Sequence, residues 1–131
     1  MNQKKIQQIY KQKVIDFFNS RTAYDLEGDS HPAEAKRLLD YVQVRSGQTI
    51  LDLATGTGLV AISAAKTVAP IGSVIGVDIS KGMLAQAKEK ILATAIDNLE
   101  LIEADIELID FNSEQFDLIF CCSALVYIRD I

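Results

Sequence analysis

Thr49-Ile-Leu-Asp-Leu-Ala-Thr-Gly-Thr-Gly58 is the stretch that decides the fold of this 131-residue chain. Its apolar first half predicts a buried strand, because such runs fill the interior of a sheet. Gly56 and Gly58 allow the backbone to turn tightly and to approach a ligand closely. A helical pattern follows, and the first N–H groups of a helix have no partner within the helix. The stretch therefore predicts a strand, a turn that cradles a ligand, and a helix.

A second apolar segment, Val74-Ile-Gly-Val-Asp-Ile-Ser80, follows this helix and reads as the next strand. Its acid, Asp78, lies 20 residues beyond Gly58. Folds that bind a nucleoside cofactor place a carboxylate at about this distance, where it accepts hydrogen bonds from the ribose. Together the two segments predict a nucleoside-cofactor site.

The residues around the turn separate two classes of cofactor better than the glycines do. Gly56-Thr-Gly58-Leu-Val-Ala61 fits the G-x-G-x-x-A form of the dinucleotide fingerprint, so the glycines alone leave NAD as a candidate. Asp52 lies four residues before Gly56, at the end of the strand. A carboxylate there would repel a pyrophosphate and attract an amino group or a sulfonium. The alternative for Asp52 is a solvated acid at a strand end.

At this point the sequence resembles the class I S-adenosylmethionine-dependent methyltransferases. The pattern Asp52-x-Ala54-x-Gly56-x-Gly58 is similar to the first motif of that family, with Ala54 where many members have glycine. Three later segments resemble further motifs in the right order: Val77 to Leu84, Leu101 to Ile106 and Phe116 to Phe120. The residues of the first motif resemble those of the branch that acts on quinones and other small molecules. The resemblance covers residues 49–123 and indicates the family, not the substrate.

The resemblance implies S-adenosylmethionine as the cofactor, and it implies a set of residues that hold it: Asp52, Ala54, Gly56, Gly58, Asp78, Ile79, Met83, Asp105, Ile106 and Ser123. Three acids take its polar groups. Asp52 faces the ammonium group directly or through water, Asp78 accepts from both ribose hydroxyls, and Asp105 accepts from the adenine N6 amine.

The other implied positions surround the cofactor with backbone and apolar groups. The backbone at Ala54, Gly56 and Gly58 lines the methionine part. The adenine ring lies between the remaining apolar side chains, Ile79, Met83 and Ile106, although Met83 could equally be core between helix and sheet. Ser123 lies near the sulfonium, with a helix N-cap as its alternative role. No catalytic residue is implied, because aligning an activated methyl group with an acceptor requires none.

The periodicity of apolar residues predicts an α/β fold. Predicted strands, 49–54, 73–78, 98–103 and 116–122, alternate with helices at 58–68 and after Ser80. Two further helices precede them, the first ending by Ser20 and the second stopped at Ser46-Gly47. We expect a Rossmann-like, doubly wound parallel sheet of order 3-2-1-4, with the site at the carboxyl ends of its strands. Residues 1–46 would be a helical cap region and residues 47–131 the cofactor-binding core.

Domains of the resembled family continue through three more strands, whereas this chain stops at Ile131. We therefore expect a core truncated after its fourth strand, either as a piece of a longer chain or as a naturally short protein. The fourth strand would then be an exposed apolar edge. Such an edge pairs readily with another chain, so we expect a homodimer through it, or aggregation.

Composition restricts the partners and the compartment. The net charge of −5 argues against a nucleic-acid partner and leaves a small-molecule acceptor. Residues 1–21 are basic, with five Lys or Arg against Asp16, which we read as a solvated helix face. No apolar run is long enough for a signal peptide or a membrane span. Cys121 and Cys122 are adjacent, which disfavours a mutual disulfide, and buried free thiols suit a cytoplasmic protein.

The segment between the first two helices contains two side chains of chemical interest. Tyr24 could cover the cofactor and recognise the methyl cation through its ring face, or it could be a packed loop tyrosine. His31 is the only histidine, but it stands beside Pro32 at an expected helix start.

Three functions remain open from the sequence. The first is a methyltransferase domain of which this chain supplies the cofactor-binding half. The second is an NAD-dependent oxidoreductase half-domain, disfavoured by Asp52 and Asp105. The third is a non-catalytic module that binds a nucleoside or assembles with a partner.

Overall fold

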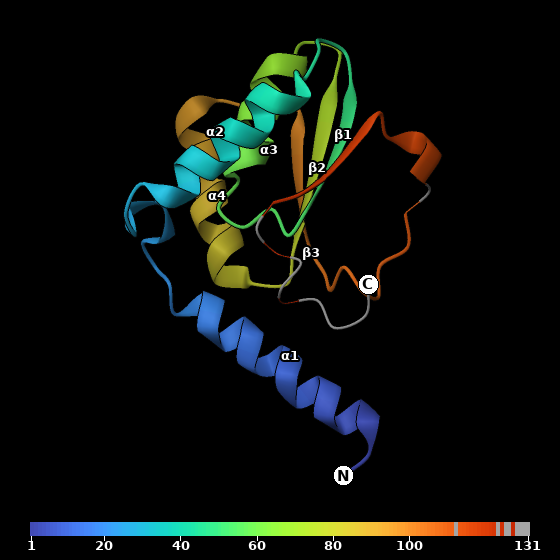
Figure 1. The fold of residues 1–131 in the computed structure, drawn as a ribbon. Coiled ribbons are helices and arrows are strands. Elements are labelled where there is room, and N and C mark those ends of the chain that lie inside the picture. The colour runs from blue at the N-terminus through green and yellow to red at the C-terminus, as the bar shows by residue number, and fades with distance from the viewer. Residues whose placement is uncertain (112, 123, 125–126, 128–131) are drawn as a thin grey trace.

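The structure is a computed structural model, and it describes residues 1–111, 113–122, 124 and 127. Four parallel strands form one sheet: β1 (Thr49–Leu53), β2 (Ser73–Asp78), β3 (Leu99–Glu103) and β4 (Leu118–Cys121). Their order is β3-β2-β1-β4, so the predicted order 3-2-1-4 is confirmed (Figure 1). The chain runs from β1 outward through β2 to β3 and then returns to the other side of β1 for β4. Folds of this kind bind ligands at the point between β1 and β4 where the strand order reverses.

The register brings the carboxyl ends of the strands to one edge. Leu53 of β1 pairs with Val77 of β2 on one side and with Cys121 of β4 on the other. Asp78 pairs with Glu103 of β3. The loops that carry Ala54, Ile79 and Ala104 therefore leave the sheet side by side.

Four helices and two short 3-10 turns accompany the sheet: α1 (Gln3–Asn19), η1 (Tyr24–Leu26), α2 (Ser30–Val42), α3 (Leu59–Val68), α4 (Lys81–Thr94) and η2 (Ser113–Gln115). Helices α2, α3 and α4 gather on one side of the strands (Figure 1). The core lies where α3 meets the sheet, and α2 contributes Ala35 to it. Ala61, Ala64 and Ala65 of α3 are fully buried, because side chains this small let the helix pack closely on the strands.

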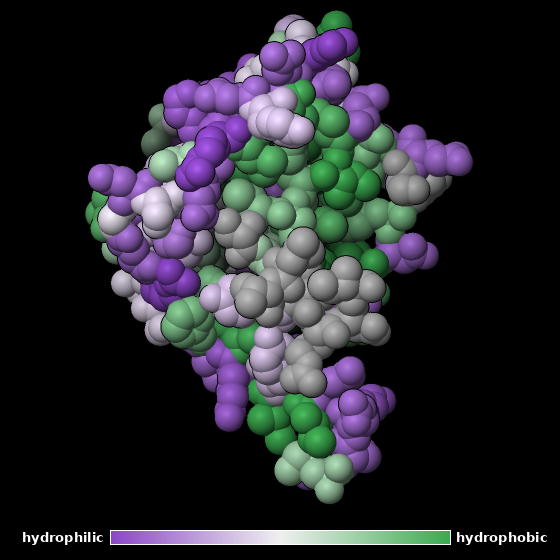
Figure 2. Space-filling view, in the orientation of Figure 1, coloured by the Kyte–Doolittle hydropathy of each residue, from purple (hydrophilic) through white to green (hydrophobic). Residues whose placement is uncertain are grey.

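Helix α1 forms where the sequence predicts it, but its apolar side chains are not buried. Ile6, Ile9 and Phe17 are 43%, 41% and 50% exposed. The last residue of the helix instead contacts the start of α4, where the Asn19 Oδ1 atom accepts hydrogen bonds from the Ser80 hydroxyl at 2.6 Å and from the Gly82 N–H at 2.9 Å. Figure 2 shows apolar side chains on the distal part of α1 and over the strands, beside the more polar surface of the other helices.

Other expectations need correction. Helix α2 ends at Val42, before Ser46-Gly47, because Gln43 adopts a left-handed conformation (φ 57°) and its N–H closes the helix on the Leu39 carbonyl. Strand β4 is shorter than the predicted 116–122. The thiols of Cys121 and Cys122 were expected to be buried, and both are only half-buried. In the part of the chain that the structure describes, no helix has both the length and the apolarity to cross a bilayer.

Candidate functional site

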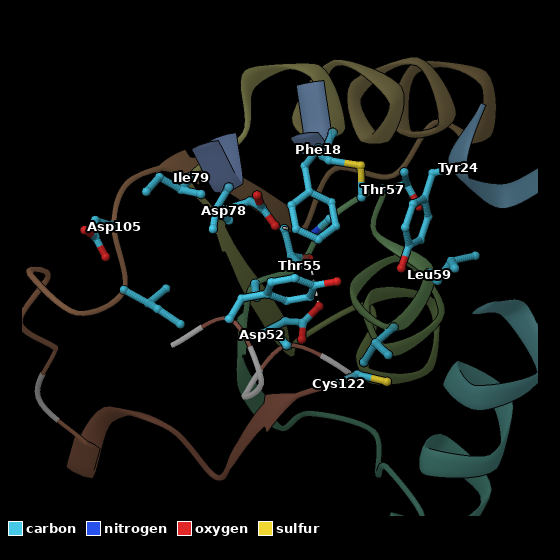
Figure 3. A pocket seen from close by; sticks show the side chains of 18 of the residues that line it. Phe18, Tyr24, Asp52, Thr55, Thr57, Leu59, Asp78, Ile79, Asp105 and Cys122 are labelled. Carbon is cyan, nitrogen blue, oxygen red and sulfur yellow. Dashed lines mark hydrogen bonds between the residues drawn. The ribbon is translucent and has the colours of Figure 1, made fainter. Parts of the chain in front are cut away.

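A cavity opens at the carboxyl ends of the strands and brings together most of the predicted site residues. Its wall includes Asp52, Ala54, Gly56, Asp78, Ile79, Met83, Asp105 and Ile106. Figure 3 shows Asp105 and Ile79 on one side, Asp78 and Asp52 in the middle, and Tyr24 with Leu59 on the other side. Gly58, the N-cap of α3, is not among the residues that line the cavity. The prediction for Ser123 lies outside the described residues.

The turn after β1 is held in a conformation that glycine favours. Gly56 and Gly58 have φ values of 58° and 80°. A Cβ atom at Gly56 would lie 3.1 Å from the Met83 Cε atom, and one at Gly58 would lie 3.0 Å from the Ile62 Cδ1 atom. Both glycines therefore serve a left-handed backbone and a close approach to neighbouring helices.

Ala54 shares this left-handed conformation, with φ 56°. Left-handed backbone is unfavourable for a residue with a Cβ atom, by roughly 1–2 kcal/mol. The backbone therefore shows a reason to prefer glycine at this position, where many members of the resembled family have it.

We expect Ala54→Gly to raise the free energy of unfolding by about 1 kcal/mol, after the greater chain entropy of glycine in the unfolded state is allowed for. Urea denaturation followed by circular dichroism measures this change. Ala95→Gly is the matched case outside the cavity, since Ala95 has φ 54° and is exposed. Ala85→Gly, on the exposed face of α4, should instead lose about 1 kcal/mol. If Ala54→Gly lowered the free energy of unfolding as Ala85→Gly does, the prediction that the backbone of Ala54 is strained would be wrong.

Asp78 is fixed in orientation by the backbone around it. Its Oδ2 atom accepts from the Gly56 N–H at 2.8 Å and its Oδ1 atom accepts from the Ser80 N–H at 2.9 Å. The residue is 9% exposed, and this burial raises the pKa of its carboxyl, while the backbone hydrogen bonds oppose the shift. A carboxylate has about four acceptor positions, so two remain for hydroxyl groups of a ligand.

Asp52 is more deeply buried, at 2% exposure. Its Oδ2 atom accepts a hydrogen bond from the Thr55 hydroxyl at 2.7 Å. Burial, with a further contribution from the charge of Asp78, raises the pKa of the Asp52 carboxyl to about 7. The predicted alternative of a solvated strand-end acid is therefore wrong. A cationic group in the cavity would offset the free energy needed to keep this carboxyl ionised.

Asp105 already has a cationic partner. The Lys11 ammonium of α1 lies 2.5 Å from the Asp105 Oδ2 atom and 2.7 Å from the Glu107 Oε2 atom. The basic face of the N-terminal helix was predicted to be solvated, and Lys11 departs from that prediction. Ile79 and Ile106, predicted to hold a ring, line the cavity in the same region.

Further contacts join the segment before α2 to the glycine turn and to α4, and sequence reasoning missed them. The Asp25 carboxylate accepts from the Thr57 hydroxyl at 2.5 Å and pairs with the Lys90 ammonium at 2.7 Å. The Gln86 side chain donates to the Arg21 carbonyl and accepts from the Tyr24 N–H. The sequence contained one sign of these contacts, the expectation that Tyr24, the neighbour of Asp25, could cover the cofactor.

Tyr24 and His31 stand together at the far side of the cavity. Their rings stack with centroids 3.9 Å apart and an interplanar angle of 14°. The Arg21 guanidinium lies 4.6 Å from the centroid of the Tyr24 ring and 3.3 Å from the His31 Nε2 atom. His31 lies in the first turn of α2, as predicted, and it also lines the cavity.

Fold and site together define a Rossmann-like α/β domain with a cavity for a nucleoside cofactor that carries a cationic group. A family described as "Methyltransferase domain" matches residues 50–131. The chain therefore belongs to the S-adenosylmethionine-dependent methyltransferase family, and the predicted resemblance is confirmed. The NAD-dependent alternative is not favoured.

Individual relatives agree with this assignment. The chain is 29% identical to aklanonic acid methyltransferase DauC of Streptomyces sp. (strain C5), over 92% of this chain and 56% of that protein. It is 34% identical to the ubiquinone/menaquinone biosynthesis C-methyltransferase UbiE of Pseudomonas entomophila, over 82% and 44%. A SAM-dependent methyltransferase structure from Aquifex aeolicus is 25% identical, with a TM-score of 0.65, over 79% and 55% of the two chains. The chain thus spans about half the length of the curated relatives that it matches.

Proposed function

We propose that this chain binds S-adenosylmethionine in the cavity, and that the protein transfers its methyl group to a small-molecule acceptor. One observation supports the proposal most strongly: three carboxylates, Asp105, Asp78 and Asp52, succeed one another along the cavity (Figure 3). Adenine, ribose and amino group succeed one another in the same way along the cofactor. The names of the relatives, which mention aklanonic acid and ubiquinone or menaquinone, support a small-molecule acceptor.

Each residue then has a part in holding the cofactor. Asp78 would accept from the ribose hydroxyls with the two acceptor positions that the backbone leaves. Asp52 would face the ammonium group, and Asp105 the adenine amine. The backbone of the glycine turn would line the methionine part, and Ile79, Met83 and Ile106 would contact the ring.

The sulfonium supplies an activated methyl group when the cofactor is bound, so the chain needs mainly to orient it. Rigid acceptors such as Asp78, held by two backbone N–H groups, fix the nucleoside in one position. Apolar walls exclude water from the reacting groups. Alignment of this kind can provide several kcal/mol of rate acceleration.

Titration of the chain with S-adenosylhomocysteine by calorimetry, with NAD as the control, tests the cofactor assignment. We expect micromolar binding of the first ligand and none of NAD. Binding of NAD alone would overturn the proposal, and so would a chain that remains folded and binds neither ligand.

Lys11 provides a second test, because its ammonium group pairs with the Asp105 carboxylate when no ligand is bound. If the adenine amine takes the place of the ammonium, Lys11→Met should strengthen S-adenosylhomocysteine binding severalfold, since breaking the pair no longer opposes binding. Calorimetry compares it with Lys13→Met, a neighbouring lysine on α1. Weaker binding by Lys11→Met would instead mean that the ammonium holds the cofactor.

The remaining parts of the proposal concern assembly, domains and location. Strand β4 pairs only with β1 among the described strands, and Ile119 is 48% exposed, which supports a homodimer through this edge. Residues 1–46 would cover the cofactor held by residues 47–131, although Ala35 of α2 packs into the core. The net charge of −5 supports a partner other than nucleic acid, and the free thiol of Cys121 supports a cytoplasmic location.

A further inference from the structure

The segment that leaves α1, residues 19–25 and here called the strap, runs along one face of α4 (Figure 1). Its first residue accepts a hydrogen bond from the Gly82 N–H at 2.9 Å. Further along the helix, the Gln86 side chain donates to one backbone carbonyl of the strap and accepts from one of its N–H groups. The Lys90 ammonium then pairs with Asp25 at 2.7 Å. These three helix residues are spaced by four, so they share one face of α4, and the strap follows that face in order.

Asp25 is the residue at which the strap reaches the glycine turn. Its Oδ2 atom accepts from the Lys90 ammonium, and its Oδ1 atom accepts from the Thr57 hydroxyl at 2.5 Å. Thr57 is only 1% exposed, and among the described residues Asp25 is the partner of this buried hydroxyl. The Asp25 carboxylate therefore links α4 to the middle of the turn.

The middle of the glycine turn depends on this link. The Gly56 N–H donates to the Asp78 carboxylate at 2.8 Å, and the Gly58 N–H donates to the Thr55 carbonyl at 2.9 Å. Thr57 lies between these two points, and its side chain is held from the strap. Glycine on both sides leaves the neighbouring backbone with wide conformational freedom. A buried hydroxyl without an acceptor is unfavourable, so the turn would rearrange if the strap did not supply one.

We infer that Asp25 is a positioning residue for cofactor binding: through the Thr57 hydroxyl it fixes the shape of the turn that receives the methionine part of the cofactor. The inference rests on the proposed function, which assigns the methionine part to this turn. Asp25 itself does not line the cavity, whereas Thr57 does. Asp78 keeps its hydrogen bond from the Ser80 N–H when Thr57 is released, so the nucleoside part should be affected much less.

Calorimetry with two ligands tests this role. Methylthioadenosine has the nucleoside of S-adenosylhomocysteine but lacks its amino-acid part. We expect Asp25→Ala and Thr57→Val each to weaken S-adenosylhomocysteine binding at least about fivefold and to leave methylthioadenosine binding within about twofold. Thr57→Ser keeps the hydroxyl and should bind both ligands within about twofold of the unaltered chain. Asp40→Ala is the matched control, since Asp40 also pairs with a lysine, Lys36, and neither residue lines the cavity.

Two results would overturn this inference alone. One is an unchanged affinity of both variants for S-adenosylhomocysteine. The other is an equal loss for the two ligands, which would mean that Asp25 only supports the fold. Failure of the unaltered chain to bind S-adenosylhomocysteine would instead overturn the proposed function and the inference with it.

The combined variant shows whether Asp25 acts through Thr57. Once Asp25 is alanine, the hydroxyl has already lost its acceptor. The chain with both Asp25→Ala and Thr57→Val should therefore bind S-adenosylhomocysteine no more weakly than Asp25→Ala alone. Losses that multiply in the combined variant would show that the two residues act separately, and would overturn the inference.

Discussion

Replacing Asp52 by asparagine is expected to stabilise the ligand-free chain and to weaken its binding of S-adenosylhomocysteine. The Asp52 carboxyl is almost fully buried, and its pKa is raised to about 7. In an unfolded chain an aspartate ionises near pH 4, so at pH 8 the folded chain must keep this carboxyl charged in an unfavourable place. Asparagine has the same shape and no charge. We expect Asp52→Asn to gain about 2 kcal/mol in the free energy of unfolding at pH 8.

The gain should depend on pH in a defined direction. Between about pH 4 and pH 7 the folded chain binds more protons at Asp52 than the unfolded chain does, so its stability falls as the pH rises. Urea denaturation at pH 5, 6, 7 and 8 should therefore show the advantage of Asp52→Asn growing with pH. Asp78, whose pKa is also raised, contributes in the same direction to both proteins, and because its charge acts on Asp52 the difference between them reports Asp52 together with its coupling to Asp78. Parallel stability curves would contradict the prediction.

Ligand binding should respond in the opposite way. An ammonium group beside Asp52 favours the ionised carboxyl, so S-adenosylhomocysteine should bind more weakly below pH 7, by up to about tenfold per pH unit. At pH 8, Asp52→Asn should lose about 100-fold in affinity, because the ligand cation is left without its partner. Methylthioadenosine has the same nucleoside but lacks the amino-acid part, and with it the α-ammonium group. The affinity for methylthioadenosine should be nearly the same in Asp52→Asn and in the unaltered chain. An equal loss for both ligands would mean that the α-ammonium group does not bind beside Asp52.

Local sequence patterns predicted the parts of the fold that depend on periodicity. The strand at Thr49–Leu53, the helix with three buried alanines and the strand ending at Asp78 follow from apolar spacing and from the glycines between them. The helix after Ser80 was also predicted, and the Ser80 hydroxyl caps it by accepting from the Met83 N–H at 3.2 Å. In each case the residues that decide the structure lie within one turn or one strand of each other.

Contacts between distant segments could not be predicted in the same way. Lys11 meets Asp105 across 94 positions, and Asp25 meets Thr57 across 32. Long side chains have many rotamers, and nothing in the spacing of a basic helix says which acid it reaches. The left-handed conformation of Ala54 was missed for another reason, because alanine gives no sign of positive φ.

Replacing Asp78 by asparagine should lower the affinity for any ligand that carries the adenosine ribose. Two charge-assisted hydrogen bonds to hydroxyl groups are each worth about 1.5–3 kcal/mol, so we expect a loss of about 100-fold or more for S-adenosylhomocysteine and for methylthioadenosine alike. Calorimetry with both ligands measures this. The pattern differs from that of Asp52→Asn, which should weaken binding only of the ligand that has the α-ammonium group, S-adenosylhomocysteine.

A structural effect of Asp78→Asn must be separated from the loss of ribose contacts. The carboxylate accepts from the Gly56 and Ser80 N–H groups, and an asparagine can accept from only one of them without turning its own N–H₂ toward the other. The variant could therefore disturb the glycine turn and weaken any ligand there. Adenosine and 2′,3′-dideoxyadenosine distinguish the two effects, because only adenosine has the hydroxyls. If Asp78 binds the ribose, the preference for adenosine should nearly disappear in the variant; if the preference persists while both affinities fall, Asp78 acts only by supporting the turn.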